Sequence, residues 1–217
     1  MNPNTGLGMT SDRTRLRMVE MLRDHGIKSE KVLLALNKVP RHLFVDEALA
    51  SRAYELVSLP IGFGQTISHP FMVARLCEHI IGDIKLDRVL EIGSGCGYQA
   101  AVLSHMATEV FSIERNVQLV SKARIRLRKM GYRSVRLRHA DGRDGLLDKA
   151  PFSAIIGTAA ASEVPSALIE QLVDGGSLVL PIGNESQELI KVTRNGDSFK
   201  ERTFEKVKFV PLLYGLV

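Results

Sequence analysis

The feature that most constrains the fold is an apolar strand that runs into a glycine-rich turn, at residues 89–98 (VLEIGSGCGY). A helix-length segment then leads to a second apolar strand, 110–114 (VFSIE), which ends in a carboxylate. Gly93 and Gly95 allow the backbone to leave the first strand with positive φ and to pass close to a ligand. Glu114 follows about twenty residues later, where a carboxylate can bind both hydroxyls of a ribose. The pattern predicts a βαβ unit that holds a ribose-containing cofactor.

The third position of the glycine pattern narrows the choice of cofactor. A dinucleotide-binding fingerprint would have a third glycine where this chain has Tyr98. The pattern GxGxG with a distal acid is instead similar to motif I of S-adenosylmethionine-dependent methyltransferases, whose cofactor has no phosphate. A purely structural turn is the alternative, because glycine turns also occur at simple strand-to-helix corners.

The length and composition are those of one globular α/β domain. The chain has 217 residues, of which 45% are hydrophobic and 24% charged, and no apolar run approaches the roughly 18 residues that a spanning helix needs. We expect a single domain, 1–217, with a helical layer and substrate loop at about 11–81 and a cofactor-binding core at 88–217. Residues 1–10 lack the features of a signal peptide, so we expect a cytoplasmic protein without a membrane partner.

The two cysteines and the basic residues suggest no further site. Cys77 and Cys96 have no metal-ligand spacing, so we expect reduced thiols and no metal. The net charge of +5 is concentrated at positions 122–138. A solvated outer face is the expected role of this cluster, and nucleic-acid binding is the alternative.

The order of strands and helices predicts a mostly parallel sheet. Further apolar strands are expected at 135–139, 152–156 and 177–181, with a helix at about 163–173 between the last two. Segments 188–193 and 204–210 have no helix between them, which indicates an antiparallel end to the sheet. Helices should cover both faces and ligands should bind at the carboxyl ends of the strands.

The first eighty residues are predicted to be helical. Helices are expected at 12–25, 29–39, 46–54 and 71–81, and Ser29 is a plausible N-cap of the second. We expect these helices to form a layer that can close over the ligand.

A second signature lies at 59–70 (LPIGFGQTISHP), between the third and fourth of these helices. A loop rich in glycine, hydroxyl and amide groups before a helix has backbone N–H groups free to meet an anion. The simpler interpretation is that Ser68 or His69 caps the following helix, with Pro70 in its first turn.

Over nearly its whole length, from about Asp12 to Val217, the chain resembles the protein-L-isoaspartate O-methyltransferase family. The matching segments are 59–70, 89–101 (VLEIGSGCGYQAA), 155–160 (IIGTAA) with 178–183 (LVLPIG), and 209–212 (FVPL). The resemblance implies a Rossmann-like α/β/α sandwich with an added N-terminal helical layer. It also implies methyl transfer from S-adenosylmethionine to the free α-carboxylate of L-isoaspartyl residues, with S-adenosylhomocysteine as product and repair through a succinimide. The expected partners are isoaspartyl proteins and peptides, the expected state is a monomer, and no nucleic acid is expected.

The resemblance also implies roles for individual residues. Ser68 would be the catalytic residue, an orienting hydroxyl that donates a hydrogen bond to the acceptor carboxylate. The substrate peptide would contact Gln65, Thr66, Ile67 and His69. The cofactor would be held by Glu91, Gly93, Gly95, Gly97, Glu114, Asp141, Gly142 and Thr158.

Two departures from the family pattern concern the wall beside the transferred methyl group. The family often has valine at the position of Gly157, and a proline soon after the paired alanines, where this chain has Ala161, Ser162 and Glu163. These departures affect the expected substrate preference.

Three other functions have weaker support. An oxidoreductase would need a catalytic Tyr-x-x-x-Lys, which is absent. A nucleic-acid methyltransferase would need an Asn/Asp-Pro-Pro-Tyr motif or a cysteine after a proline, and the chain has neither. A non-enzymatic cofactor-binding protein would not need the segment from Gln65 to Ser68.

Overall fold

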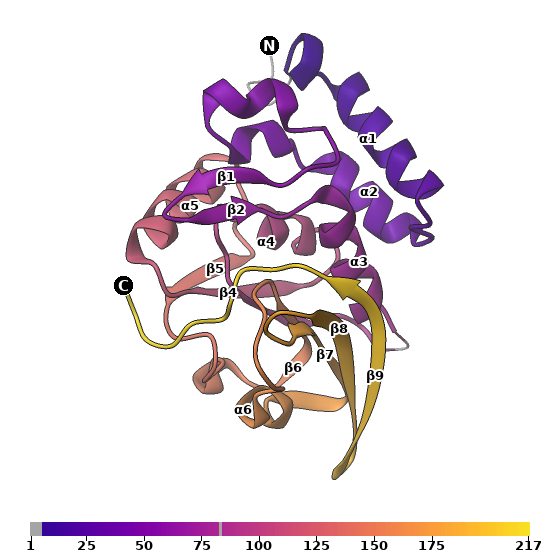
Figure 1. Ribbon diagram of the computed structural model, residues 1–217, viewed down its shortest axis with the longest axis vertical. Helices are drawn as coiled ribbons and strands as arrows, with labels where there is room; N and C mark the ends of the chain where they lie inside the picture. The colour runs from indigo at the N-terminus through magenta and orange to yellow at the C-terminus, as the bar shows by residue number, and fades with distance from the viewer. Residues whose placement is uncertain (1–5, 83) are drawn as a thin grey trace.

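The structure is a computed structural model, described here for residues 6–82 and 84–217. Residues 1–5, which belong to the segment expected to lack a signal peptide, lie outside the described residues. The sheet has seven strands in the order β5-β4-β3-β6-β7-β8-β9 (Figure 1). Strands β5 to β7 pair in parallel, whereas β8 and β9 add an antiparallel end, as predicted. The strands are β3 (Arg88–Ile92), β4 (Glu109–Glu114), β5 (Val135–His139), β6 (Phe152–Gly157), β7 (Leu172–Ile182), β8 (Gln187–Asn195) and β9 (Ser198–Val207).

Helices cover the two faces of the sheet unequally. One core joins the N-terminal helices to strand residues such as Val89 and Val179, and the other joins the α6 side to Leu90 and Leu178. These strand residues alternate between faces, as the period of two in a strand requires. The α-helices are α1 (Asp12–Asp24), α2 (Glu30–Lys38), α3 (Pro70–Ile80), α4 (Tyr98–Leu103), α5 (Val117–Lys129) and α6 (Ser166–Glu170), and the 3₁₀ helices are η1 (Gly8–Thr10), η2 (Arg41–Phe44), η3 (Glu47–Arg52) and η4 (Leu147–Lys149).

Most of the predicted helices are confirmed, with shifts of one or two residues at their ends. Ser29 caps α2, with its hydroxyl accepting from the Val32 N–H at 3.5 Å. The basic residues of α5 mostly lie on its exposed side. Cys77 and Cys96 are free and buried, and burial raises the pKa of both thiols.

Two predicted helices were wrong in type or length. The helix predicted at 46–54 is the 3₁₀ helix η3, Glu47–Arg52, because the Leu49 and Ala53 amides bond to carbonyls three residues back. The helix predicted at 163–173 is only α6, five residues long. Pro165 disfavours helical backbone at the residue before it, and Leu172 already pairs with β6 as the first residue of β7.

Two predictions about loops and strands also needed correction. The strand expected at 204–210 corresponds only to the end of β9, which begins at Ser198 after a turn at Gly196 and ends at Val207, so that 208–210 lie outside it. The segment 59–70, expected to be a loop, contains a two-stranded hairpin of β1 (Leu59–Gly62) and β2 (Gln65–Ile67). Its tip, residues 62–64, has three successive positive φ angles, which a sequence pattern of apolar alternation does not show.

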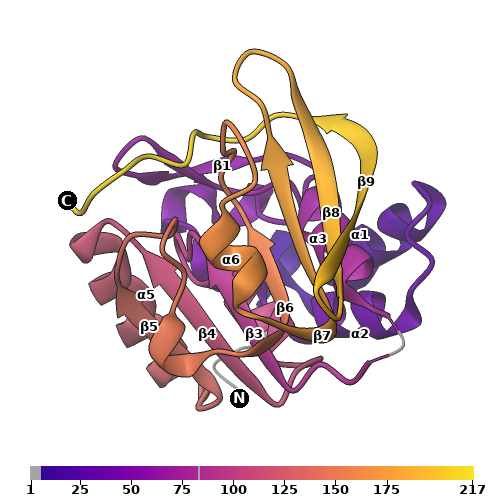
Figure 2. The same cartoon turned by 90° about the horizontal axis from the view of Figure 1, so that it is seen from below.

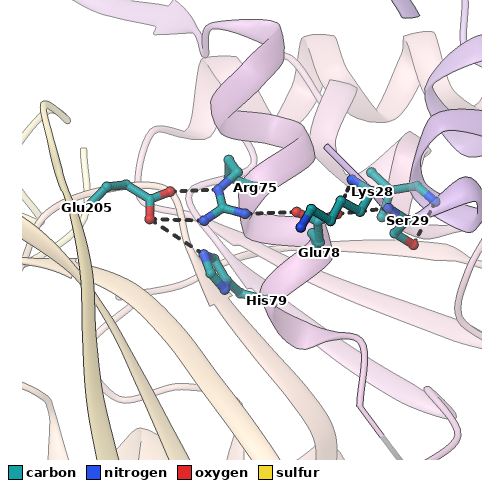
Figure 3. Close-up of polar contacts among 7 residues, drawn as sticks. Lys28, Ser29, Arg75, Glu78, His79 and Glu205 are labelled. Atoms are coloured by element: carbon teal, nitrogen blue, oxygen red, sulfur yellow. Dashed lines mark hydrogen bonds and ion pairs between the residues drawn. The ribbon is translucent and has the colours of Figure 1, made fainter. Parts of the chain in front are cut away.

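A polar network fastens α3 to both the other helices and the sheet (Figure 3). Arg75 donates to both carboxylate oxygens of Glu205 on β9, at 2.7 and 3.1 Å, and to Glu78 at 2.8 Å. The other oxygen of Glu78 accepts from the backbone N–H groups of Lys28 and Ser29, at 2.7 and 2.8 Å. The network fixes α3, whose first turn follows the Ser68 segment.

The C-terminal segment after β9 crosses the sheet from one edge to the other (Figures 1 and 2). It ends beside α5, where the Val117 N–H donates to the Val217 carbonyl at 2.8 Å. Arg115 donates to the carbonyls of Tyr214 and Gly215, both at 3.0 Å. We call residues 208–217 the tail.

Within the described residues, no helix is long and apolar enough to cross a membrane.

Candidate active site

A cavity of ≈ 350 Å³ lies at the carboxyl ends of the central strands. Four segments surround it: the β1–β2 hairpin, the glycine turn after β3, the end of β4, and the tail. A volume in this range suits a small-molecule cofactor. Of the residues predicted for the site, the cavity is lined by Gln65, Thr66, Ile67, Ser68, His69, Glu91, Gly93, Gly95, Glu114, Gly142 and Thr158.

The glycine turn and Glu114 are joined directly. The Gly95 N–H donates to one carboxylate oxygen of Glu114 at 3.0 Å, and the Asn116 N–H donates to the other at 3.0 Å. Each carboxylate oxygen has a second lone pair, so Glu114 keeps acceptor capacity for ribose hydroxyls. The predicted pairing of the turn with the distal acid is therefore present in the fold.

Gly93 shows why this position requires glycine. Its φ is +92°, and a Cβ there would lie 2.4 Å from the Thr158 hydroxyl oxygen. Thr158 donates to the carbonyls of Ile92 and Gly93, at 3.0 and 2.7 Å, which fixes the end of β6 against the turn. The cavity wall here consists of backbone and one threonine.

Glu91 is a buried carboxyl in the cavity wall. Ser112 donates to one of its oxygens, while Oε1 has no hydrogen-bond partner among the described residues. Burial raises the pKa of Glu91 to about 8, and the nearby Glu114 adds to this, although the Ser112 hydrogen bond opposes it. At neutral pH Glu91 is therefore mostly protonated and can donate as well as accept.

The structure holds Asp141 and Gly97 outside the cavity lining. The Asp141 carboxylate accepts from the backbone N–H groups of Arg143, at 3.0 Å, and of Gly215 in the tail, at 2.6 Å. Gly97 instead caps α4, where a Cβ would lie 3.0 Å from Leu127. Gly142, next to Asp141, lines the cavity and packs against Ile92.

Ser68 and His69 have different roles in the structure. The His69 ring accepts from the Phe71 N–H at 3.1 Å and so caps α3, with Pro70 in the first turn. Ser68, in contrast, lines the cavity and is not the N-cap of α3. Helix capping therefore accounts for His69 but not for Ser68.

Sequence reasoning missed two groups of lining or supporting residues. The tail contributes Lys208, Leu213 and Val217 to the cavity, whereas the sequence resemblance extends only to its FVPL segment. Arg41 donates to the Ser68 carbonyl at 2.8 Å from 27 residues away in the chain. Only the three-dimensional path of the chain brings either group to the site, so no local pattern would have found them.

The residues present fit S-adenosylmethionine. Four lining residues carry buried polar atoms without partners among the described residues: Glu91 Oε1, Ser94 Oγ, Tyr98 Oη and Gln99 Oε1. Unpaired buried polar groups are costly, and the amino and carboxylate groups of a methionine moiety could satisfy them. In the described part of the chain, no group of three or more His, Cys, Asp or Glu could hold a metal ion.

Comparison with known proteins identifies the family. The family described as Protein-L-isoaspartate(D-aspartate) O-methyltransferase matches residues 13–216. The chain belongs to this family. A Protein-L-isoaspartate O-methyltransferase of Nitrosomonas eutropha is 52% identical over 216 residues, with 99% of this chain and 97% of the relative covered. One of Methylobacillus flagellatus is 54% identical over 215 residues, with 97% and 96% covered.

Solved structures agree with the family assignment. A protein-L-isoaspartate O-methyltransferase structure has a TM-score of 0.85 at 26% identity and covers 93% of this chain and 67% of its own. A putative enzyme of the same kind from Plasmodium falciparum, in complex with S-adenosyl-L-homocysteine, has a TM-score of 0.81 at 24% identity and covers 92% and 98%. The expected fold is confirmed, and the chain is an S-adenosylmethionine-dependent methyltransferase.

Proposed function

We propose that this chain methylates the free α-carboxylate of L-isoaspartyl residues in the cavity between the β1–β2 hairpin and the glycine turn. The observation that carries the assignment of roles is the Ser68 hydroxyl, which borders the cavity and is not used as a helix cap. The family assignment supplies the reaction class, and the position of this hydroxyl supports its role in orienting the acceptor.

When bound, S-adenosylmethionine supplies a methyl group on a positively charged sulfur. The acceptor carboxylate is already ionised at neutral pH, since its ordinary pKa is near 4, so no strong base is needed. The protein must align the carboxylate and exclude water, which can lower the barrier by about 7 to 11 kcal/mol in favourable cases. Ser68 would donate a hydrogen bond to the acceptor, and Gln65, Thr66 and Ile67 would hold the peptide main chain beside it.

The cofactor side of the cavity would be divided among the residues already described. Glu114 would bind the ribose, and Gly93, Gly95 and Thr158 would border the reacting end. Glu91 would meet the methionine moiety, and Gly142 with Asp141 would lie at the adenine. Binding of the adenine by Asp141 would require its carboxylate to share or release the Gly215 N–H.

We also propose that the enzyme is a cytoplasmic monomer that acts on proteins and not on nucleic acids. Two free, buried thiols are consistent with a reducing compartment. Arg136 and Arg138 of the basic cluster are paired with Glu109 and Asp148, which reduces the charge available to a polyanion. Light scattering would test the monomer, and methyl transfer to total RNA would test the exclusion of nucleic acid.

The decisive experiment compares two synthetic peptides that differ only in isoaspartate or aspartate at one position. Transfer of labelled methyl from S-adenosylmethionine should occur on the isoaspartyl peptide and hardly at all on its twin. Equal rates on the two peptides, or transfer to RNA alone, would overturn the proposed substrate.

A further inference from the structure

Arg41 is the one fully buried arginine among the described residues. Its Nε donates to the Ala53 carbonyl at 2.8 Å, and its Nη2 donates to the carbonyls of Val57 and Ser68, at 3.3 and 2.8 Å. It forms no ion pair with any described carboxylate. A buried cation that has only neutral acceptors is costly, which raises the question of what it does.

Two of the three carbonyls that accept from Arg41 flank the β1–β2 hairpin. Val57 comes just before β1 begins at Leu59, and Ser68 comes just after β2 ends at Ile67. The guanidinium therefore holds both ends of the hairpin that carries Gln65, Thr66 and Ile67. Ser68 is one of the two fixed ends, and it also lines the cavity.

The other side of Arg41 contacts the cofactor-binding element. Its guanidinium carbon lies 4.8 Å from the centre of the Tyr98 ring, and Tyr98 is the first residue of α4, directly after the glycine turn. Phe44, from the same 3₁₀ helix as Arg41, packs edge-on against Tyr98 at 5.4 Å between ring centres. One side chain thus joins the hairpin to the element that follows the cofactor turn.

We propose that Arg41 is a positioning residue for methyl transfer: it fixes the Ser68 backbone relative to the glycine turn, so that the Ser68 hydroxyl meets the acceptor carboxylate. This inference rests on the proposed function. A planar guanidinium suits the task because it presents several donors in fixed directions, which a lysine ammonium does not.

Two substitutions at Arg41 and one control test the proposal on the intact chain. Arg41→Lys and Arg41→Met should each lower kcat on the isoaspartyl peptide by at least tenfold, with the Lys variant less affected than the Met variant. The Kd for S-adenosylhomocysteine should stay within threefold of wild type, and the number of binding sites in the same titration gives the fraction of folded molecules. Arg52→Met removes an exposed arginine of the same layer and should leave kcat unchanged. Wild-type kcat in Arg41→Lys would overturn the proposal.

If Arg41 is a positioning residue, the loss of kcat in its variants must depend on the Ser68 hydroxyl. A purely structural role of Arg41 would not depend on it. In a Ser68→Ala background, Arg41→Lys should lower kcat by less than threefold. A further tenfold loss in that background would show that the two residues act independently and would overturn the proposal. Wild-type kcat in Ser68→Ala alone would instead contradict the role proposed for Ser68.

A measurement on the wild-type protein covers the case in which the Arg41 variants do not fold. The buried Nε–H of Arg41 should give a slowly exchanging NMR signal, unlike the exposed arginines. In protein saturated with S-adenosylhomocysteine, this signal should shift when the isoaspartyl peptide is added and not when the aspartyl twin is added. If neither peptide shifts the Arg41 signal, the proposal is overturned.

Discussion

At the scale of single residues, the neighbouring side chains of Ser68 and His69 differ in what they contact. His69 satisfies an amide at the start of α3, whereas Ser68, one position earlier, faces the cavity. The order Ser-His-Pro in the sequence left both assignments open, because either side chain can reach the first amides of a helix. The backbone path resolves the question, since only one of the two residues occupies the N-cap position.

Substitution of Ser68 should therefore affect catalysis, whereas substitution of His69 should affect stability. We predict that Ser68→Ala lowers kcat at least tenfold, about 1.4 kcal/mol of transition-state stabilisation, with little change in the free energy of unfolding. His69→Ala should lower the free energy of unfolding by about 1 kcal/mol through loss of the cap. Urea unfolding and single-turnover kinetics on the isoaspartyl peptide measure the two quantities. A folded Ser68→Ala protein with wild-type kcat would contradict the assignment.

Glu91 predicts a dependence of stability on pH. Because its pKa is raised to about 8, the folded protein keeps a proton that the unfolded chain has lost. The free energy of unfolding should therefore fall as pH rises from the ordinary glutamate value toward about 8, by up to about 1.4 kcal/mol per pH unit, and this loss should end above about 8. Glu91→Gln should remove the dependence. Urea unfolding of both proteins at pH 6 and pH 8 tests this, and equal pH dependence would show that Glu91 ionises normally.

At the scale of elements, sequence patterns located what is buried and regular. The near-continuous apolar strands at 89–92 and 152–156 and the amphipathic helices 12–24 and 70–80 were recognisable because burial imposes a period. The hairpin 59–67 was missed because its tip depends on positive φ angles and its strands are short. The helix at 163–173 was overestimated because apolar residues there belong partly to β7, and periodicity cannot separate the two over so few residues.

The α3 network should contribute measurably to stability. We predict that Arg75→Gln lowers the free energy of unfolding by about 1 to 3 kcal/mol, because it removes charge-assisted bonds between partly buried groups. The matched control is Arg52→Gln, whose ion pair with Glu55 is exposed and should cost less than about 0.5 kcal/mol.

The ion pair of Arg75 with Glu205 determines how the stability contributed by α3 depends on pH. The hydrogen bond from Arg75 lowers the pKa of Glu205. Its stabilisation is therefore present above the ordinary carboxyl pKa and is lost as pH falls through the lowered value. The difference between wild type and Arg75→Gln, measured by urea unfolding, should shrink below about pH 4. A difference that does not change with pH would mean that the pair contributes through packing alone.

At the scale of the whole molecule, we propose that the chain unfolds as one unit. The larger core combines helix residues such as Leu22 and Leu36 with strand residues such as Val110 and Val179, so the helical layer shares its core with the sheet; the smaller core lies wholly within the cofactor-binding half. Far-UV circular dichroism and tyrosine fluorescence should give one coincident transition in urea. Two separate transitions would divide the chain into the helical layer and the cofactor-binding core.

The overall assembly was only partly visible in the sequence. The order of the strands was not predicted, but the mostly parallel sheet with its antiparallel end followed from the alternation of strands and helices. The path of the tail could not be predicted, because residues 208–217 have no secondary-structure period and are held by contacts with distant parts of the chain, such as Asp141 to Gly215. Long-range contacts of this kind connect positions 74 residues apart and have no local signature.

The burial of both thiols makes the protein convenient for site-specific labelling. Thiol reagents attack the thiolate, and burial raises the pKa of Cys77 and Cys96 and holds both in the neutral form, although Cys96 borders the cavity. A cysteine introduced at Leu216, an exposed position in the tail, would then be the reactive thiol without removal of the native pair. A fluorophore there could report whether the tail moves when the cofactor enters, while slow modification of the native thiols would time the opening of the core.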